Sequence, residues 1–435
     1  MRTLLTLSLS FWITFSFSQN LYFPPPTGSE WKTTAPEELG WCSDKVDSLI
    51  RFVEDKNTKA FIILKDGRIV VEEYFGTFTQ DSLWYWASAG KSLMGAMIGL
   101  AQQEGFLSIG DPTSDYLGEG WTACSPEDEQ LITIRHQLSM ASGLDDSLEP
   151  AGSIVNCFDP ECFQCLAVPG TRWAYHNSAY RILQDVLEEA TGVNKNVYTL
   201  TRLGSRIGMN GLWFDYIFFS RARDMARFGL FTLARGTWNG EAILSDTAYF
   251  NAMVNSSQPV NPSYGYLWWL NGKASYMLPG LQFSFPGSLL PDAPADLIAA
   301  LGKNDQKVYV APSEGLVVVR MGESAGGVMP AASSFDNQLW QRIMALECTT
   351  AVEETGLDMP DLKVFPNPTT EGLQINSSLP IRELRLFDIH GRLIRIMAGS
   401  GTGRQFVNRS ALSSGVYHLQ VMTDAGPAVE RLVVR

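Results

Sequence analysis

A polar, turn-rich stretch at 349–362, TTAVEETGLDMPDL, divides the chain into two parts of different character. Upstream of it, apolar residues recur with helical and strand spacing, whereas the tail consists of short alternating runs separated by Gly and Ser. The tail 361–435 has nine Lys and Arg against six Asp and Glu, although the whole chain has a net charge of −13. We therefore predict two folded parts, a linker at 349–362 and a small all-β sandwich module at 363–435.

The N-terminus predicts export. An apolar run from Leu4 to Phe15 follows one Arg and precedes a Ser-Phe-Ser sequence that ends at Ser18. This order is typical of a secretory signal peptide, and we expect residues 1–18 to be removed by cleavage near Ser18. The run is short for a membrane span, and an uncleaved anchor is the alternative. The acidic balance argues against nucleic acid or an anionic membrane as a partner.

Six Cys follow this segment, and an even number in an exported chain predicts disulfides. The pairing stays open, because six Cys allow fifteen pairings. A zinc site formed by Cys157, Cys162, Cys165 and His176 is the alternative. Its spacing matches no zinc module and export favours oxidation, so we expect no metal and no organic cofactor.

Between about residues 40 and 348, the apolar spacing predicts a sheet packed against helices. The stretch KAFIILKDGRIVVEEYFG predicts two strands joined at Asp66-Gly67, and QKVYVAPSEGLVVVRMG predicts a second hairpin. Expected helices lie at 44–55, from the Ser-Lys segment to Glu104, at 220–235 and over SSFDNQLWQRIMALE. Strands at both ends with helices between them predict one sheet assembled from distant parts of the chain, which is an α/β fold.

The stretch WYWASAGKSLMGAMIGL, at 84–100, places a Ser and a Lys at the start of a predicted helix. Ser88 and Lys91 are three residues apart, so their side chains share one helix face. The free N–H groups and the dipole at a helix N-terminus favour an anion, such as an activated Ser oxygen. We predict that Ser88 is a nucleophile and that Lys91 takes its proton; an ordinary helix N-cap is the alternative.

The stretches WAYHNSAY and LGKNDQKVYV supply further candidates. Tyr175 near cations is a possible base, and Asn177 is able to hydrogen-bond both Lys91 and an acyl amide. Lys303 precedes a predicted strand, where its ammonium group would bind a carboxylate or polarise the site. A second Tyr-x-Asn sequence at 249–251 lies in a helical stretch, and we expect it to serve packing.

In the order Ser-x-x-Lys, Tyr-x-Asn, Lys-x-x, these clusters resemble the serine β-lactamase and penicillin-binding protein superfamily, and more closely its class C β-lactamase and esterase branch. ITIRHQLSMASGLDD at 132–146 and GTWNGEAIL at 236–244 resemble the same branch. The resemblance covers about 40–348. It implies a domain at 19–348 with a mainly antiparallel sheet, flanking helices and a helical subdomain.

The resemblance also implies a role for each candidate. Ser88 would be the nucleophile, with Lys91 and Tyr175 as the shared proton-transfer groups. The oxyanion hole would consist of the Ser88 N–H and a strand N–H near Gln306. Substrate contacts would come from Asn177, Lys303 and Gln306.

One departure from the family pattern concerns the third cluster. The family usually has Lys-Thr-Gly or His-x-Gly where this chain reads Lys303-Asn304-Asp305. We expect Asp305, at the Gly place, to add bulk and a negative charge beside the oxyanion site. Turnover of β-lactams would then be impaired.

The stretch GESAG at 322–326 offers a competing nucleophile, because Gly-x-Ser-x-Gly after a strand is the elbow of α/β-hydrolases. An elbow should lead straight into a helix, but glycines and Pro330 interrupt here. The only later His residues are His390 and His418, both in the tail. We therefore expect Ser324 not to be the nucleophile.

The tail stretches VFPNPTTEGLQI, LFDIHGRLI and LSSGVYHLQVMTDAG resemble the C-terminal sorting domain of cargo for type IX secretion. The resemblance implies contact with that secretion machinery, export from a Gram-negative cell, and later removal of the tail or surface attachment. A carbohydrate-binding or adhesive β domain is the alternative. The membrane would serve only as the export route or the place of attachment.

The hypothesis is an exported serine hydrolase that acts on an ester or amide through an acyl-enzyme. Alternatives are a penicillin-recognising binding protein with little turnover and a surface adhesion protein. Esters, β-lactams, D-peptides and ω-amino acid amides all remain open as substrates. Trp268 and Trp269 either line an apolar cleft or, as we expect, pack inside the sheet.

Overall fold

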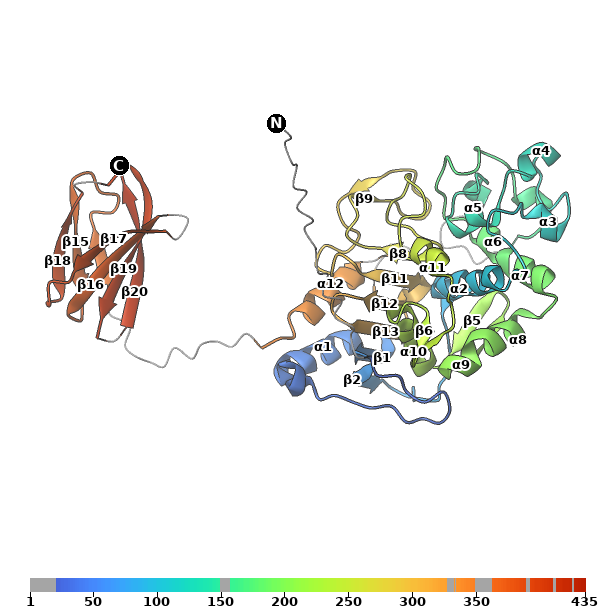
Figure 1. The fold of residues 1–435 in the computed structure, drawn as a ribbon, viewed down its shortest axis with the longest axis horizontal. Coiled ribbons are helices and arrows are strands. Elements are labelled where there is room, and N and C mark those ends of the chain that lie inside the picture. The colour runs from blue at the N-terminus through green and yellow to red at the C-terminus, as the bar shows by residue number, and fades with distance from the viewer. Residues whose placement is uncertain are drawn as a thin grey trace, which may run out of the picture. The chain divides into compact units, whose positions relative to one another are not determined.

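The computed structural model describes residues 21–148, 157–326, 332, 334–348, 362–388, 392–409, 412–424 and 426–435. The chain forms two compact units, residues 1–348 and 349–435 (Figure 1). The predicted signal peptide and nearly all of the predicted linker lie outside the described residues. Within the described residues, no helix has both the length and the apolar character that a membrane crossing requires.

The first unit is built on a six-stranded antiparallel sheet with the order β2-β1-β13-β12-β11-β8. Its strands are β1 (Thr58–Lys65), β2 (Arg68–Tyr74), β8 (Trp269–Leu270), β11 (Ile298–Gly302), β12 (Gln306–Ala311) and β13 (Leu316–Gly322). Because β1 pairs with both β2 and β13, the sheet joins the two ends of the unit, which confirms the α/β prediction. The sequence patterns did not predict β11.

Helices cover both faces of this sheet, which explains why the central strand β13 is buried along its whole length. Gly229 of α10 (Ala222–Leu233) lies so close to one face that a Cβ there would meet a Val317 methyl group at 2.4 Å. On the other face, Trp340 of α12 (Ser334–Met344) packs edge-on against Tyr309 with ring centroids 5.7 Å apart. Helix α1 (Ser43–Asp55) packs beside α12 and against β1.

Helix α2 (Gly90–Gln103) is buried from Gly90 to Ala101 and packs against α7 and α11 as well as β11. Tyr249 of α11 donates its hydroxyl to the Gly95 carbonyl at 2.6 Å, which confirms that this second Tyr-x-Asn serves packing. The helical region that Figure 1 shows beyond α2 contains α3 (Ser114–Leu117), α4 (Pro126–Glu129), α5 (Ile134–Leu138), α6 (Asn177–Arg181), α7 (Leu183–Thr191), α8 (Lys195–Thr199) and α9 (Ser205–Ile207). Helix α11 spans Thr247–Met253.

The second unit consists of two antiparallel sheets, with the orders β14-β15-β18 and β17-β16-β19-β20. Ile375 of the first sheet and Leu384 and Val421 of the second share one buried core, which confirms the predicted β-sandwich. The strands are β14 (Leu362–Phe365), β15 (Gly372–Ser377), β16 (Ile381–Asp388), β17 (Leu393–Ala398), β18 (Arg404–Asn408), β19 (Gly415–Thr423) and β20 (Gly426–Val434).

All six Cys form disulfides: Cys42–Cys348, Cys124–Cys165 and Cys157–Cys162. The zinc alternative is therefore wrong, because the three sulfurs that it required are consumed in two of these bonds. His176 instead accepts a hydrogen bond from the Ala179 N–H at 3.3 Å and caps the start of α6.

Removal of the Cys42–Cys348 bond is expected to lower the free energy of unfolding by about 2–5 kcal/mol, because this bond closes a loop with a sequence separation of 306. Urea denaturation of a Cys42→Ser/Cys348→Ser variant measures the loss. The matched control is Cys157→Ser/Cys162→Ser, which opens a loop with a separation of only 5 and should cost less. Equal losses in the two variants would contradict the loop argument.

Candidate active site

Ser88 lies between a short strand and a buried helix. The chain passes from β3 (Trp84–Tyr85) through the 3₁₀ turn η2 (Ala87–Ala89) into α2. Ala87 has a φ of 48°, in the left-handed region, so the chain turns sharply just before the serine. Fully buried Trp86 fixes this turn, because its indole N–H donates to Ser220 Oγ at 2.7 Å and its ring meets Phe218 edge-on.

The Ser88 hydroxyl contacts Lys91, as the sequence spacing predicted. Lys91 Nζ donates to Ser88 Oγ at 2.9 Å, and the Lys91 side chain is almost fully buried. The N-cap of α2 is Ala89, and the N-cap of η2 is Trp86. The alternative that Ser88 is an ordinary helix cap is therefore wrong.

Lys91 also joins the Ser88 segment to the start of α6. Its Nζ donates to Asn177 Oδ1 at 2.9 Å, which joins two residues that are 86 positions apart in the sequence. The same nitrogen lies 4.8 Å from the ring centroid of Tyr175 and 4.3 Å from that of Tyr180. These two oxygens and two rings are among the groups that position the amine.

Tyr175 completes the cluster around Ser88. The Ser88 side chain is a neighbour of its phenol and favours the phenolate. Desolvation by burial raises the pKa of Tyr175 well above its usual value, while Ser88 acts in the opposite direction. The surrounding rings include Trp269, stacked at a centroid distance of 5.9 Å, and Trp173 and Tyr264, each at 6.3 Å. Tyr175 is therefore a neutral phenol at neutral pH in the resting site, and forming its anion requires a neighbouring positive charge.

Replacing Tyr175 by Phe is expected to lower kcat by about 10²-fold, because the ring packing survives while the proton-transfer hydroxyl is lost. Steady-state kinetics on a small ester would measure this, with thermal unfolding to verify the fold. The control is Tyr264→Phe, which alters a ring neighbour of Tyr175 without touching Ser88. Unchanged kcat in Tyr175→Phe would exclude the phenol from proton transfer.

The third predicted cluster lies at the turn between β11 and β12. Gly302, the last residue of β11, is so close to the Ser88 segment that a Cβ there would meet the Trp86 carbonyl oxygen at 2.5 Å and the Ala89 nitrogen at 3.0 Å. Lys303 follows directly and its side chain is exposed. The strand that borders Ser88 therefore ends at Gly302, immediately before the predicted Lys.

The Gln306 side chain is fully buried, and its amide group is engaged in hydrogen bonds to the backbone of the turn and of β13. Its amide nitrogen donates to the carbonyls of Asn304 at 3.0 Å and Gly322 at 2.6 Å, and its oxygen accepts from the Gly322 N–H at 3.1 Å. Only the backbone of Gln306 is left to meet a substrate. Its contribution to an oxyanion hole stays a prediction.

The carboxylate of Asp305 does not point as expected, and the effect of this residue on turnover stays a prediction. Its carboxylate accepts from the Ala325 N–H at 2.9 Å and lies 3.2 Å from Lys307 Nζ. The sequence reasoning assumed that an Asp at the Gly place would point its charge at the oxyanion site. The chain instead has a positive φ of 57° at this residue, and the buried Lys307 is the counter-ion of the carboxylate.

Ser324 lies in a bend after β13, and its hydroxyl accepts from the Gly326 N–H at 3.3 Å. No helix begins at Ser324 or in the next two residues, all of which the structure describes. His418 belongs to the second unit, and His390 lies outside the described residues. The geometry expected of a nucleophile elbow is therefore not present at Ser324.

Sequence reasoning missed two residues that contact this cluster. Tyr180 lies three residues after Asn177, so helical spacing could have placed both on one face of α6. Gly302 precedes Lys303 directly, but only the fold shows that its backbone passes against η2. Trp268 and Trp269 are buried in the core, as expected.

Comparison with solved structures shows the same fold in several bacterial proteins. A putative 6-aminohexanoate-dimer hydrolase from Bacillus anthracis has a TM-score of 0.56 and 19% identity, with 73% of this chain and 86% of that chain covered. A putative beta-lactamase from Bacteroides dorei has a TM-score of 0.55 and 18% identity, with 70% of this chain and 99% of that chain covered. At these identities the likeness concerns the fold alone.

Sequence comparison gives the family. An uncharacterized protein from Alkalihalophilus pseudofirmus is 24% identical over an alignment of 340 residues that covers 65% of this chain and 91% of that protein. Residues 50–339 match the family model Beta-lactamase, and residues 363–435 match the model of a secretion system C-terminal sorting domain. The chain therefore belongs to the beta-lactamase family and ends in a secretion system C-terminal sorting domain.

Proposed function

We propose that this protein is an exported serine hydrolase that cleaves an ester or amide through an acyl-enzyme on Ser88. The observation that carries the proposal is the position of Lys91 Nζ, which lies 2.9 Å from both Ser88 Oγ and Asn177 Oδ1. A buried amine between a hydroxyl and an amide oxygen, with a phenol beside the same hydroxyl, is an arrangement for activating a nucleophile. Membership of the beta-lactamase family supports a serine-hydrolase-like function in general terms.

In the proposed reaction, Ser88 Oγ attacks the acyl carbon while its proton passes to the Lys91–Tyr175 pair, in which the free amine of Lys91 is the acceptor. The same pair then delivers a proton to the departing alcohol or amine, which leaves the acyl group bound to Ser88. A water molecule attacks this ester and returns the free serine, so no further reactant is needed. The strand end at Gly302, against η2, is the candidate second side of the oxyanion hole.

Two assignments within this reaction are also proposals. Asn177 would hold Lys91 and contact an amide of the substrate, since its oxygen accepts from Lys91 and its NH₂ group is a donor. Lys303, exposed directly after Gly302, would bind an anionic group of the substrate. The fold relatives, a putative 6-aminohexanoate-dimer hydrolase and a putative beta-lactamase, are compatible with an acyl substrate in either class.

The sorting domain at 363–435 supports export, with the type IX secretion machinery as the proposed partner and the cell surface or the medium as the destination. The alternative of a binding protein with little turnover depended on Asp305 impairing the oxyanion site. The contacts of that carboxylate with Lys307 and the Ala325 N–H support turnover over the binding alternative.

A panel of small esters, D-amino-acid peptides, linear ω-amino acid amides and a chromogenic cephalosporin tests the proposal. We expect sustained turnover of at least one acyl class by the purified wild-type protein. A single stoichiometric burst without turnover would favour the binding protein. Inertness to the whole panel and to a fluorophosphonate probe would contradict a hydrolase and favour the adhesion alternative.

A further inference from the structure

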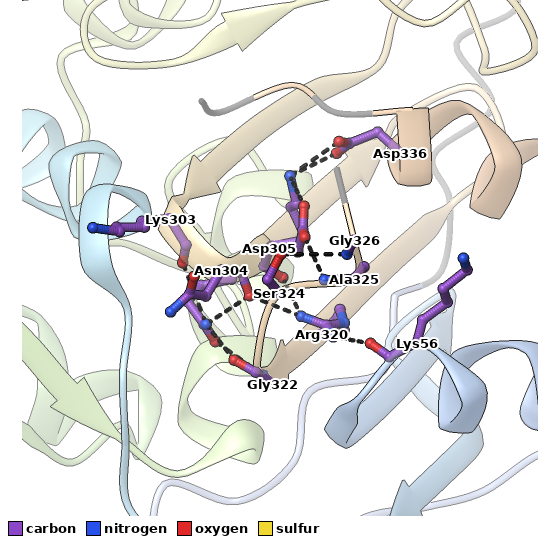
Figure 2. Close-up of polar contacts among 12 residues, drawn as sticks. Lys56, Lys303, Asn304, Asp305, Arg320, Gly322, Ser324, Ala325, Gly326 and Asp336 are labelled. Carbon is purple, nitrogen blue, oxygen red and sulfur yellow. Dashed lines mark hydrogen bonds and ion pairs between the residues drawn. The ribbon is translucent and has the colours of Figure 1, made fainter. Parts of the chain in front are cut away.

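A buried charged cluster lies behind the turn that ends the strand beside Ser88 (Figure 2). The turn consists of Lys303, Asn304 and Asp305, between β11 and β12. In Figure 2 the Lys303 side chain points away from this cluster, whereas Asp305 and Arg320 lie within it. One side of the turn thus carries Lys303, the candidate substrate contact, and the other side is fixed in the core.

The backbone of this turn is unfavourable for residues that have a Cβ. Asn304 and Asp305 both have a φ of 57°, which places two consecutive residues in the left-handed region. Glycine adopts this conformation freely, but other residues need surrounding contacts to hold it. Arg320 makes those contacts, since its Nη1 donates to the carbonyls of Asn304 at 3.0 Å and of Asp305 at 2.9 Å.

Arg320 uses its whole guanidinium group in this way. Its Nη2 donates to the carbonyls of Lys56 at 2.6 Å and of Glu323 at 2.8 Å, and its Nε donates to Thr58 Oγ1 at 3.0 Å. Together with the carbonyls of Asn304 and Asp305, these three acceptors give one acceptor for each of the five N–H donors of arginine. The side chain is fully buried, and burial lowers the pKa of Arg320 to about 10, so it remains charged at neutral pH.

The Asp305 side chain fixes the turn from the same side. Its carboxylate accepts from the Ala325 N–H at 2.9 Å and pairs with Lys307 at 3.2 Å. Lys307 in turn lies 3.0 Å from Asp336 of α12, and Tyr309 donates to the same carboxylate. All of these side chains are buried, so loss of one partner would leave an uncompensated charge in the core.

The other face of the turn meets the Ser88 segment. Asn304 Nδ2 donates to Tyr85 Oη at 2.8 Å, and Tyr85 lies three residues before Ser88. Gly302 passes against η2 so closely that no side chain fits between them. The distance from the strand end to Ser88 is therefore set by the conformation of this turn.

We propose that Arg320 is a positioning residue for hydrolysis at Ser88: its five hydrogen bonds hold the Asn304–Asp305 turn, and the turn holds the backbone at Gly302 beside the nucleophile. This inference rests on the proposed function for its kinetic consequence. Its structural part, the dependence of the turn on Arg320, stands by itself and is measured separately.

Arg320→Lys is the main test, because lysine keeps the charge but supplies three donors in place of five. We expect kcat to fall about tenfold to a hundredfold with little change in KM, since a small shift of positioned groups affects the transition state most. Amide hydrogen exchange over residues 302–306 should become faster. The matched control is Arg342→Lys, whose guanidinium donates to the Gln338 carbonyl within α12 and should change neither readout.

Two further variants keep the test decisive. If Arg320→Lys does not yield folded protein, Thr58→Val removes one of the five acceptors and should lower kcat about threefold. Asp305→Asn removes the negative charge. If the carboxylate faced the oxyanion, this variant would have a higher kcat than the wild type. We expect instead a lower kcat and faster amide hydrogen exchange over residues 302–306. Thermal unfolding shows which variants remain folded.

Wild-type exchange and wild-type kcat in a folded Arg320→Lys protein would overturn the inference, as would a gain of kcat in Asp305→Asn. A wild-type protein without Ser88-dependent turnover would instead refute the proposed function. Exchange over 302–306 would then still decide whether Arg320 holds the turn.

Discussion

Replacing Ser88 by Ala is expected to lower hydrolysis of any accepted ester or amide by about 10⁴-fold or more, because no acyl-enzyme forms without its hydroxyl. The fold should survive, since Ser88 is only partly buried and does not cap either adjoining helix. Labelling by a fluorophosphonate should disappear together with activity. Thermal unfolding of the variant would verify that the loss is chemical.

The matched control for this variant is Ser324→Ala. Ser324 lies in the competing GESAG stretch, and its hydroxyl accepts only a local hydrogen bond from Gly326 among the contacts described. We expect this variant to keep wild-type turnover and labelling. A reversal, with activity lost in Ser324→Ala and kept in Ser88→Ala, would move the nucleophile to the bend after β13.

Lys91→Ala is expected to slow acylation of Ser88 by about 10³-fold, within the range that positioned acid–base groups contribute. The amine is the shared partner of the Ser88 hydroxyl and the Asn177 amide, so its loss removes the proton acceptor and the fixed position of Asn177 together. Stopped-flow measurement of the acylation rate separates this step from deacylation.

Lys195→Ala is the control for Lys91→Ala. Lys195 also lies over a tyrosine ring, at 4.7 Å from the centroid of Tyr216, but it pairs with Glu188 and contacts none of the candidate catalytic groups described. Acylation in this variant should match wild type. Acylation near the wild-type rate in a folded Lys91→Ala protein would exclude Lys91 from the reaction.

The local part of the site was predictable from the sequence because it depends on helix geometry. A spacing of three residues brings Ser88 and Lys91 together whatever the rest of the chain does. The meeting of Lys91 with Asn177 depends on the tertiary fold, and only the ordered set of motifs pointed to it. Tyr180 could have been added from its spacing to Asn177.

The part that the sequence did not predict depends on contacts between distant backbone groups. Strand β11 is five residues long, lacks alternation and ends at Gly302, so its pattern does not distinguish a strand from a buried helix segment. Arg320 donates mainly to main-chain carbonyls. Because every residue has such a carbonyl, the residue types do not show which ones Arg320 contacts. The error at Asp305 has the same origin, because the direction of its carboxylate follows from a positive φ and a buried Lys307.

The second unit was predictable for a different reason. Burial alternates along its strands, as β20 shows with Ala428 and Leu432 buried and Val429 and Arg431 exposed. A two-residue period is readable from the sequence without any tertiary information. Disulfide pairing was not readable, because it joins positions such as Cys42 and Cys348 whose proximity only the fold creates.

The most direct measurement treats the wild-type protein with a fluorophosphonate at neutral pH and locates the bound phosphonyl group by peptide mass spectrometry. A single adduct on Ser88, formed far more slowly in Lys91→Ala and Tyr175→Phe, is the predicted result. An adduct on Ser324 or another residue, or an unreactive Ser88 in folded protein, would contradict the assignment of the nucleophile and its proton-transfer pair.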